Sequence, residues 1–295
     1  MSDSDKAASP GARLRAQLGA GELIVAPGIF DGVSAHLVRR MGFRVGYLTG
    51  AGVAASGFAL PDVGLVGMAE MVERVAMATG VLKEIPLIAD ADTGYGPPAS
   101  AARTVRAYEQ AGAAAIQLED QAFPKRCGHL AGKRIVTVEA FLAQLGAALD
   151  ARRDALIIAR TDARAVSGLD VAIERANTYS EAGADVIFIE APRSMDEITR
   201  IGREVAAPKL INIVAGGLTP AIDHATLTAL GFAIAIYPTT ALLAATDAVI
   251  KALAGIDNGA ESDAGLSTAT MEDFFRLVGL DDWFDIGDRW CVPGE

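Results

Sequence analysis

A short stretch of the chain, residues 124–132 (PKRCGHLAG), gathers side chains that can move protons. It contains one of the two cysteines and one of the three histidines of the sequence, Cys127 and His129, together with Lys125. Nearby cations lower the pKa of a thiol, and a thiol in such surroundings can transfer a proton to a substrate. Gly128 lets the backbone approach a ligand closely. These residue types predict a catalytic loop.

A cysteine and a histidine two positions apart would also suit the start of a zinc site. No second cluster of Cys or His follows at ligand spacing, however, and the other cysteine, Cys291, stands near the end of the sequence. Structural zinc sites need four such ligands, so the spacing disfavours zinc. A surface loop without chemistry remains the alternative at this point.

Carboxylates recur where apolar runs end. Asp90 and Asp92 close the run at 86–92, and Glu119 falls near the end of the run at 114–120. On a strand, residues two apart point to the same side, and paired carboxylates repel one another unless a cation or a shared proton offsets them. Oxygen ligands favour a hard cation such as Mg2+, which takes few carboxylates directly. We predict a metal site here, with helix caps or ion-pair partners as the alternative.

Polar residues close three further apolar runs. Arg160 and Asp162 end the run ALIIARTD. Glu190 lies near the end of VIFIEA, and Asn212 lies within KLINIV. In parallel α/β barrels, catalytic groups gather at the C-terminal ends of the strands. A barrel needs polar loops but not a charged residue at the end of strand after strand, so the pattern predicts an active site.

Eight short runs rich in Val, Ile and Leu recur along the chain. They cover residues 23–31, 45–50, 86–92, 114–120, 155–162, 186–191, 209–214 and 234–238. Such runs suit strands that are buried on both faces. Helix-like stretches separate them, including 99–111 and 169–182, which are followed by Gly112 and Gly183 as left-handed C-caps. This alternation predicts a (β/α)8 barrel, and an open doubly wound sheet is the alternative.

We predict a single barrel domain over residues 1–295. Its core spans about 22–255, and the residues from about 256 form a C-terminal helical extension. That tail contains a helical segment with Phe274, Phe275 and Leu277. These apolar side chains need a surface to cover, either on the same barrel or on that of a neighbouring subunit.

Composition narrows the classes of function. The net charge of −11 argues against nucleic acid as a partner, although a local basic pocket would still bind an anionic substrate. Two cysteines fit a reducing compartment, the cytoplasm. The N-terminal residues lack an apolar signal region, and the longest apolar run is interrupted by a proline, threonines and an aspartate. We therefore expect no membrane association.

The stretch GAGVAA at 50–55 matches the dinucleotide-binding pattern. It is followed by GFALPDVG, whose Pro61 and glycines we do not expect to open a helix, and this disfavours a dinucleotide site. We interpret Thr49 to Gly52 instead as a turn whose backbone N–H groups hold a carboxylate.

Several segments together resemble the isocitrate lyase/phosphoenolpyruvate mutase superfamily, on its short-chain lyase side. They are YLTGAGVAAS, GFALPD, DADTGYG, QLEDQAFPKRCGH, ARTDA and AIYP, and the resemblance runs from about residue 12 to about residue 290. KRCGH beside LEDQ is the specific signal among them. The resemblance implies a barrel whose C-terminal helix is swapped between subunits, a homotetramer, and dependence on Mg2+, with Mn2+ as an alternative ion.

The resemblance also implies roles for the matching residues. Asp90 would be the main direct magnesium ligand, and the waters of the ion would be held by Asp62, Asp92 and Glu119. Substrate would be bound by Thr49, Gly50, Ala51, Gly128, Arg160, Glu190 and Asn212. Cys127 would be the general acid, on a loop that closes over the substrate with Lys125 and His129 beside it.

The implied reaction is a retro-Claisen cleavage of a substituted malate, such as 2,3-dimethylmalate or methylisocitrate. The hydroxyl loses its proton, the C2–C3 bond breaks, and a 2-oxo acid forms beside the enolate of a carboxylic acid. Arg160 and His129 would stabilise that enolate, and Cys127 would protonate its carbon. Tyr47 or a magnesium-bound water would be the base.

Departures from the family pattern bear on the substrate. NIVAGGLTP replaces the Thr-Glu-Phe-Gly stretch of methylisocitrate-cleaving relatives, which brings the chain closer to dimethylmalate and petal-death-type lyases. Pro238 stands where oxaloacetate hydrolases carry a serine, and Ala51 replaces a glycine. Oxaloacetate hydrolysis or decarboxylation and non-catalytic binding of a dicarboxylate are the alternatives.

Overall fold

The computed structural model describes residues 8–128, 130–257 and 270–290. Eight parallel strands pair in chain order and close on themselves as a barrel, with β1 hydrogen-bonded to β8. The strands are β1 (Ile24–Ile29), β2 (Gly46–Leu48), β3 (Leu87–Asp90), β4 (Ala115–Glu119), β5 (Leu156–Thr161), β6 (Val186–Ile189), β7 (Lys209–Asn212) and β8 (Phe232–Tyr237). The predicted (β/α)8 barrel is confirmed, and the open sheet is excluded by the β1–β8 pairing.

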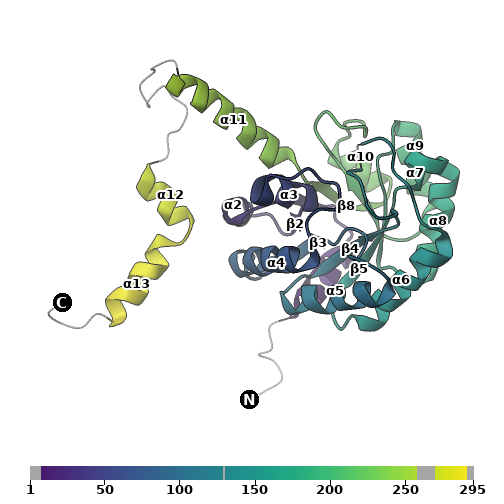
Figure 1. Ribbon diagram of the computed structural model, residues 1–295, viewed down its shortest axis with the longest axis horizontal. Coiled ribbons are helices and arrows are strands. Elements are labelled where there is room, and N and C mark those ends of the chain that lie inside the picture. The colour runs from purple at the N-terminus through teal and green to yellow at the C-terminus, as the bar shows by residue number, and fades with distance from the viewer. Residues whose placement is uncertain (1–7, 129, 258–269, 291–295) are drawn as a thin grey trace.

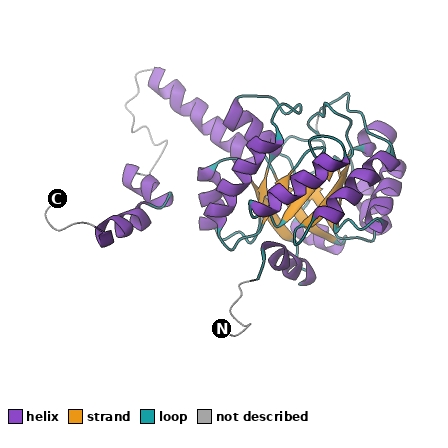
Figure 2. Ribbon diagram, turned by 60° about the horizontal axis from the view of Figure 1, so that its bottom comes forward, coloured by secondary structure: helices purple, strands orange, loops and turns teal. Residues whose placement is uncertain are grey.

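Helices surround the barrel and connect its strands, with one further helix before β1 and another leading out from β8 (Figure 2). They are α1 (Pro10–Gly19), α2 (Gly32–Arg40), α3 (Gly50–Phe58), α4 (Met68–Leu82), α5 (Pro98–Gln110), α6 (Val138–Ala151), α7 (Ala163–Ser167), α8 (Leu169–Glu181), α9 (Met195–Glu204), α10 (His224–Ala229) and α11 (Thr240–Asp257). Both predicted helices are confirmed as α5 and α8. Gly112 and Gly183 follow them with φ of 96° and 108°, as left-handed C-caps require.

Two apolar layers hold the barrel together, because alternate strand residues face opposite sides. Ile158 and Phe188 belong to the layer inside the barrel. Their chain neighbours Ile157 and Ile187 belong to the layer between the strands and the helices. Burial on both faces explains why the strands appear in the sequence as continuous apolar runs.

Residues 50–58 correct one expectation. They form helix α3, whose N-cap Thr49 accepts a hydrogen bond from the Gly52 backbone N–H. The helix ends at Phe58, and its C-cap Ala59 has a left-handed conformation with φ of 54°, so Pro61 lies beyond the helix. The predicted turn is therefore the first turn of a helix. The closed barrel, and not the absence of a helix, is what separates this segment from a dinucleotide-binding fold.

The C-terminal elements extend away from the barrel (Figure 1). Helix α11 leads out from β8, and α12 (Met271–Leu277) and α13 (Leu280–Trp290) follow at a distance, with none of their residues buried. The predicted helical segment is confirmed as α12, but its Phe274 and Phe275 remain 41% and 45% exposed. Within the described ranges, no helix combines the length and the apolar character that a membrane crossing requires.

Candidate active site

A cavity of about 270 Å³ lies at the carboxyl ends of the strands. Nine of the predicted site residues line it: Tyr47, Thr49, Ala51, Asp90, Cys127, Gly128, Arg160, Glu190 and Asn212. They come from separate strands and loops, and they meet because parallel strands present their carboxyl ends at one rim of the barrel. Gly50, Asp62, Asp92, Glu119 and Lys125 lie next to this set, as the contacts below show. His129 lies outside the described residues.

Asp90, the last residue of β3, is held from three sides. Its Oδ1 accepts hydrogen bonds from Gln117 Nε2 at 3.2 Å and from the Asp92 backbone N–H at 3.1 Å. Its Oδ2 accepts one from the backbone N–H of Gly50 at 3.3 Å. Gly50 therefore directs its N–H at Asp90, and this carboxylate has one fixed orientation toward the cavity.

Asp92 corrects a second expectation. The strand ends at Asp90, and Asp92 lies beyond it with a left-handed φ of 47°, so the two-residue period of a strand does not align the pair. The two carboxylates are neighbours because the Asp92 N–H bonds back to Asp90. Burial raises the pKa of Asp92 to about 7, with Lys125 opposing the rise and Asp90 and Asp62 adding to it.

Lys125 places its ammonium among the acidic residues. Its Nζ forms ion pairs with Asp62 and with Asp92, the latter at 2.7 Å. Burial alone would lower the pKa of Lys125, but Asp92 and Glu119 outweigh it and raise the pKa well above its ordinary value. The ammonium therefore stays charged and offsets part of the repulsion between these carboxylates.

Glu119 supplies the feature that bears most directly on a metal. Its Oε2 lies 3.3 Å from Arg160 Nε, whereas its Oε1 is buried without a hydrogen-bond partner. Buried polar atoms rarely lack a hydrogen-bond partner, so we expect a hydrogen-bond donor or a cation to bind this oxygen. Burial raises the pKa of Glu119 well above normal, against the effect of Arg160 and Lys125.

The donor set fits Mg2+ held largely through its waters. In the described part of the chain, no three His, Cys, Asp or Glu side chains converge to chelate an ion directly. Asp90 with Asp62, Asp92 and Glu119 offers only oxygen atoms, as a hard cation prefers. Mg2+ commonly takes one or two carboxylates and keeps several waters, which matches one fixed carboxylate surrounded by more distant ones.

Arg160 supplies the positive charge of the cavity wall, where it lies among carboxylates. Its Nε lies 3.0 Å from Asp162 Oδ2, and its Nη2 lies 3.4 Å from Glu190 Oε2. The guanidinium stacks over the ring of Phe188, with 5.2 Å between Cζ and the ring centroid. Asn212 donates from Nδ2 to both oxygens of Glu190 at 3.4 Å. These contacts fix a charged guanidinium at the cavity wall.

The loop that carries Cys127 is held by backbone and side-chain contacts. The Cys127 N–H donates to the carbonyl of Asp62 at 3.1 Å. Gln121 binds Arg126, the residue before Cys127. Its side-chain amide donates to the Arg126 carbonyl at 2.8 Å and accepts from the Arg126 N–H at 2.9 Å. These contacts hold Cys127 in the wall of the cavity that Asp90 and Arg160 also line.

Sequence reasoning missed Gln117. This residue is fully buried in β4, accepts a hydrogen bond from the Tyr47 hydroxyl at 3.1 Å and donates to Asp90. A glutamine inside the apolar run AAIQLED was the available signal, since a buried amide needs partners. Burial, reinforced by Asp90, raises the pKa of Tyr47 well above 10. Tyr47 is therefore a protonated hydrogen-bond donor.

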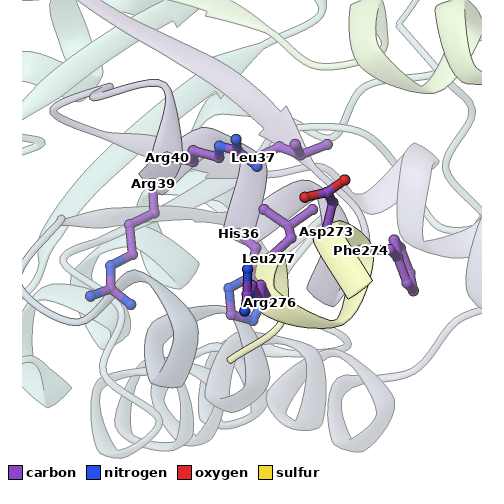
Figure 3. A pocket seen from close by; sticks show the side chains of 8 residues that line it. All are labelled: His36, Leu37, Arg39, Arg40, Asp273, Phe274, Arg276 and Leu277. Atoms are coloured by element: carbon purple, nitrogen blue, oxygen red, sulfur yellow. The ribbon is translucent and has the colours of Figure 1, made fainter. Parts of the chain in front are cut away.

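A larger hollow, of about 800 Å³, lies at the outer surface where α2 faces α12 (Figure 3). It is lined by His36, Leu37, Arg39, Arg40, Asp273, Phe274, Arg276 and Leu277. None of the predicted catalytic or metal-binding residues is among them. The hollow exists because α12 stands off from the barrel instead of packing against it.

A closed parallel barrel with acidic and basic groups at the carboxyl ends of its strands is the architecture of (β/α)8-barrel enzymes. The family model for phosphoenolpyruvate phosphomutase matches residues 14–257. The chain belongs to the phosphoenolpyruvate mutase/isocitrate lyase superfamily, which confirms the resemblance drawn from its motifs.

Named relatives and solved structures support the same assignment. The chain is 44% identical to a 2,3-dimethylmalate lyase of Eubacterium barkeri, over 92% of this chain and 94% of the relative. It is 43% identical to a 2-methylisocitrate lyase of Aeropyrum pernix, over 93% and 89%. A crystal structure of 2,3-dimethylmalate lyase matches with a TM-score of 0.91 and 36% identity, covering 96% of each chain. Oxaloacetate acetylhydrolase bound to 3,3-difluorooxalacetate matches with a TM-score of 0.89 and 36% identity, covering 95% and 96%.

Proposed function

We propose that the protein is a Mg2+-dependent carbon–carbon lyase that cleaves a substituted malate into a 2-oxo acid and a carboxylic acid. The observation that carries the proposal is the convergence of Cys127, Asp90 and Arg160 on one cavity of about 270 Å³. A proton donor, a metal-binding carboxylate and a fixed cation are the three groups that this reaction requires. The lyase activities named for the relatives support it.

The acidic side of the cavity would hold the ion. Asp90 would be the direct ligand, and Asp62, Asp92 and Glu119 would bind its waters, with Mn2+ as an alternative ion. The orphan Oε1 of Glu119 and the fixed orientation of Asp90 support this assignment. An ion held there would supply Lewis-acid chemistry, which lowers the pKa of the substrate hydroxyl.

Side chains of the protein would bind the substrate carboxylate and transfer the proton. Arg160 would pair with a substrate carboxylate, and Glu190 and Asn212 would keep its guanidinium in place. After the C2–C3 bond breaks, its electron pair is held as the enolate of the departing carboxylic acid. The Cys127 thiol would then give its proton to C3. Tyr47 would act as a hydrogen-bond donor and not as the base, because its pKa is raised.

The apolar wall of the cavity indicates which substituents the malate carries at C2 and C3. Phe188, Val214, Ile236 and Leu243 line it, and Arg160 is the one basic side chain among the described lining residues. Among those described residues, a third substrate carboxylate would find no second cation and would lose its hydration. This wall favours malates with small alkyl groups at C2 and C3 over tricarboxylates.

Oxaloacetate hydrolysis is the second candidate, because the oxaloacetate acetylhydrolase structure is so similar. Pro238 lines the cavity and offers no hydroxyl at the position where that activity would use a serine. A panel of malates and oxaloacetate, assayed for pyruvate and for oxalate, separates the two reactions. Oxalate without any 2-oxo acid from malates would replace the lyase proposal, and binding without turnover would favour a non-catalytic dicarboxylate binder.

Cys127→Ser tests the proton donor within the same panel. We expect cleavage to fall by about 10²-fold or more, because a hydroxyl is a far weaker acid than a thiol. Binding of a substrate analogue and of Mg2+ should persist. Cleavage at the wild-type rate would exclude Cys127 as the acid.

The exposed helices support a homo-oligomer. Trp283 and Phe284 on α13 are 71% and 60% exposed, and Ile250 and Leu253 on α11 are each 60% exposed. Exposed apolar groups of this size mark interaction surfaces. A homotetramer with exchanged C-terminal helices would cover them, and we place it in the cytoplasm, as the two cysteines indicate. Trp283→Asp together with Phe284→Asp should reduce the assembly size in light scattering, whereas Asp285→Asn should not.

A further inference from the structure

Lys133 is a buried lysine that takes no part in the proposed chemistry. It follows the Cys127 loop and does not line the 270 Å³ cavity. Its ammonium lies 2.8 Å from Asp162 Oδ1, and the two side chains are 2% and 0% exposed. The same ammonium donates to the backbone carbonyl of Gly128. One buried cation therefore connects the loop to the end of β5.

A buried ammonium is costly unless its charge and its hydrogen bonds are met. Lys133 meets both needs with acceptors from two separate segments of the chain. Asp162 follows β5, and Gly128 is the residue directly after Cys127. Moving the loop away from the barrel would separate the ammonium from at least one of these acceptors, so the contact holds the loop in place.

Asp162 is a firm anchor for this contact. Its backbone N–H donates to Asp120 Oδ1 at 3.0 Å. Asp120 Oδ2 in turn accepts hydrogen bonds from Thr161, Arg175 and Tyr179, at 2.7, 3.0 and 3.0 Å. The Asp120 carboxylate, held by these donors, fixes the backbone at Asp162, and Arg160 Nε holds the Asp162 carboxylate at 3.0 Å, so Asp162 has little freedom to follow a moving loop.

Gly128 has correspondingly little room. A Cβ atom at this position would lie 2.6 Å from Glu190 Cδ and 2.7 Å from Arg160 Nη2, so the backbone lies directly against that ion pair. A small shift of Gly128 would therefore displace the adjacent Cys127 relative to Arg160. Reacting groups misplaced by about 1 Å lose about 10²-fold in rate.

We propose that Lys133 is a positioning residue, which holds the Gly128 carbonyl against Asp162 and thereby keeps the Cys127 thiol over the substrate. The inference rests on the proposed lyase function. Its effect on the thiol is nevertheless measurable without any substrate, so the two proposals fail in different ways.

The test compares Lys133→Met with Arg134→Met, both in a Cys291→Ser background. Arg134 is the exposed neighbour, and its side chain makes no hydrogen bond or ion pair with the described residues, so its variant removes a charge without releasing the loop. We expect Lys133→Met to lower kcat by about 10²-fold with a much smaller change in KM. Alkylation of Cys127 by iodoacetamide should accelerate by about tenfold, since the loop opens more often. Arg134→Met should change neither.

Lys133→Arg is the conservative variant, and it distinguishes loss of the ion pair from a general loss of folding in Lys133→Met. It keeps a cation that can reach both acceptors, so it should recover slow alkylation and most of kcat. Lys133→Met with wild-type kcat and wild-type alkylation would overturn the proposal. So would an arginine variant that stays folded in thermal melting but is as impaired as the methionine variant. Faster alkylation in a protein that cleaves no malate would uphold the positioning role and reject the lyase.

Discussion

Gln117 Nε2 donates a hydrogen bond to Asp90 Oδ1 over 3.2 Å, from β4 to the end of the neighbouring strand β3. The other end of the same amide accepts from the Tyr47 hydroxyl at 3.1 Å. One fully buried side chain thus fixes both the carboxylate expected to bind the metal directly and a phenol of the cavity wall. Groups that orient a metal ligand in this manner contribute to affinity although they never touch the ion.

Gln117→Leu should weaken Mg2+ binding by roughly tenfold, because Asp90 loses its orienting donor and the Tyr47 hydroxyl loses its acceptor. Isothermal titration with Mg2+ or Mn2+ measures the change. Gln110→Leu, at the exposed end of α5, is the matched control and should bind as the wild type does. Equal affinity in both variants would mean that Asp90 is not the direct ligand or does not need Gln117.

Tyr47→Phe should lower kcat/KM by about tenfold, the typical cost of one lost hydrogen bond of about 1.4 kcal/mol. The pH profile should keep its shape. Burial and the nearby Asp90 raise the pKa of Tyr47 well above 10, so the phenol remains protonated at lower pH and contributes no titration there. A loss of several orders of magnitude, with a limb of the pH profile removed, would instead identify Tyr47 as the base.

Removal of metal with EDTA should abolish turnover while leaving the barrel folded. Lys125 pairs with Asp62 and Asp92, and Arg160 pairs with Glu119. These carboxylates therefore remain paired with cationic side chains after the metal is removed. We expect the melting temperature to shift by no more than about 4 °C, the equivalent of roughly 1 kcal/mol in a domain of this size. Excess Mg2+ should restore activity. Unfolding on chelation would show that the ion is structural.

Glu197→Gln should lower the free energy of unfolding by about 1 kcal/mol near neutral pH, because it breaks the paired contacts with Arg164 at 2.5 and 2.9 Å. Hydrogen bonds from Arg164, opposed by burial, lower the pKa of Glu197 in the folded state. Its stabilisation is therefore complete above the unfolded pKa of about 4.3 and is lost as the pH falls through the lower folded value.

Urea denaturation at neutral and at acidic pH measures this dependence. The difference between the wild type and Glu197→Gln should shrink as the pH falls. Glu181→Gln, on an exposed residue at the end of α8, should show no difference at either pH. A difference for Glu197→Gln that stays constant with pH would assign the effect to packing.

Much of the fold was predictable because the barrel repeats one local pattern. Each strand is buried on both faces and so appears as an apolar run, and Gly112 and Gly183 mark where helices end. Helix α3 was missed because its residues are mostly glycine and alanine, whose weak amphipathic pattern hides a helix that the Thr49 cap and packing stabilise.

The sequence by itself determined which residue types stand at the carboxyl ends of the strands, and a parallel barrel brings those ends together whatever their separation along the chain. Only the tertiary structure decided which of them touch. Lys133 meets Asp162, and Gln117 meets Asp90, across separations of 29 and 27 residues. Such contacts depend on strand register, on the left-handed turn at Asp92 and on the path of one loop. None of these leaves a periodic trace in the sequence, because each is set by packing against segments distant along the chain.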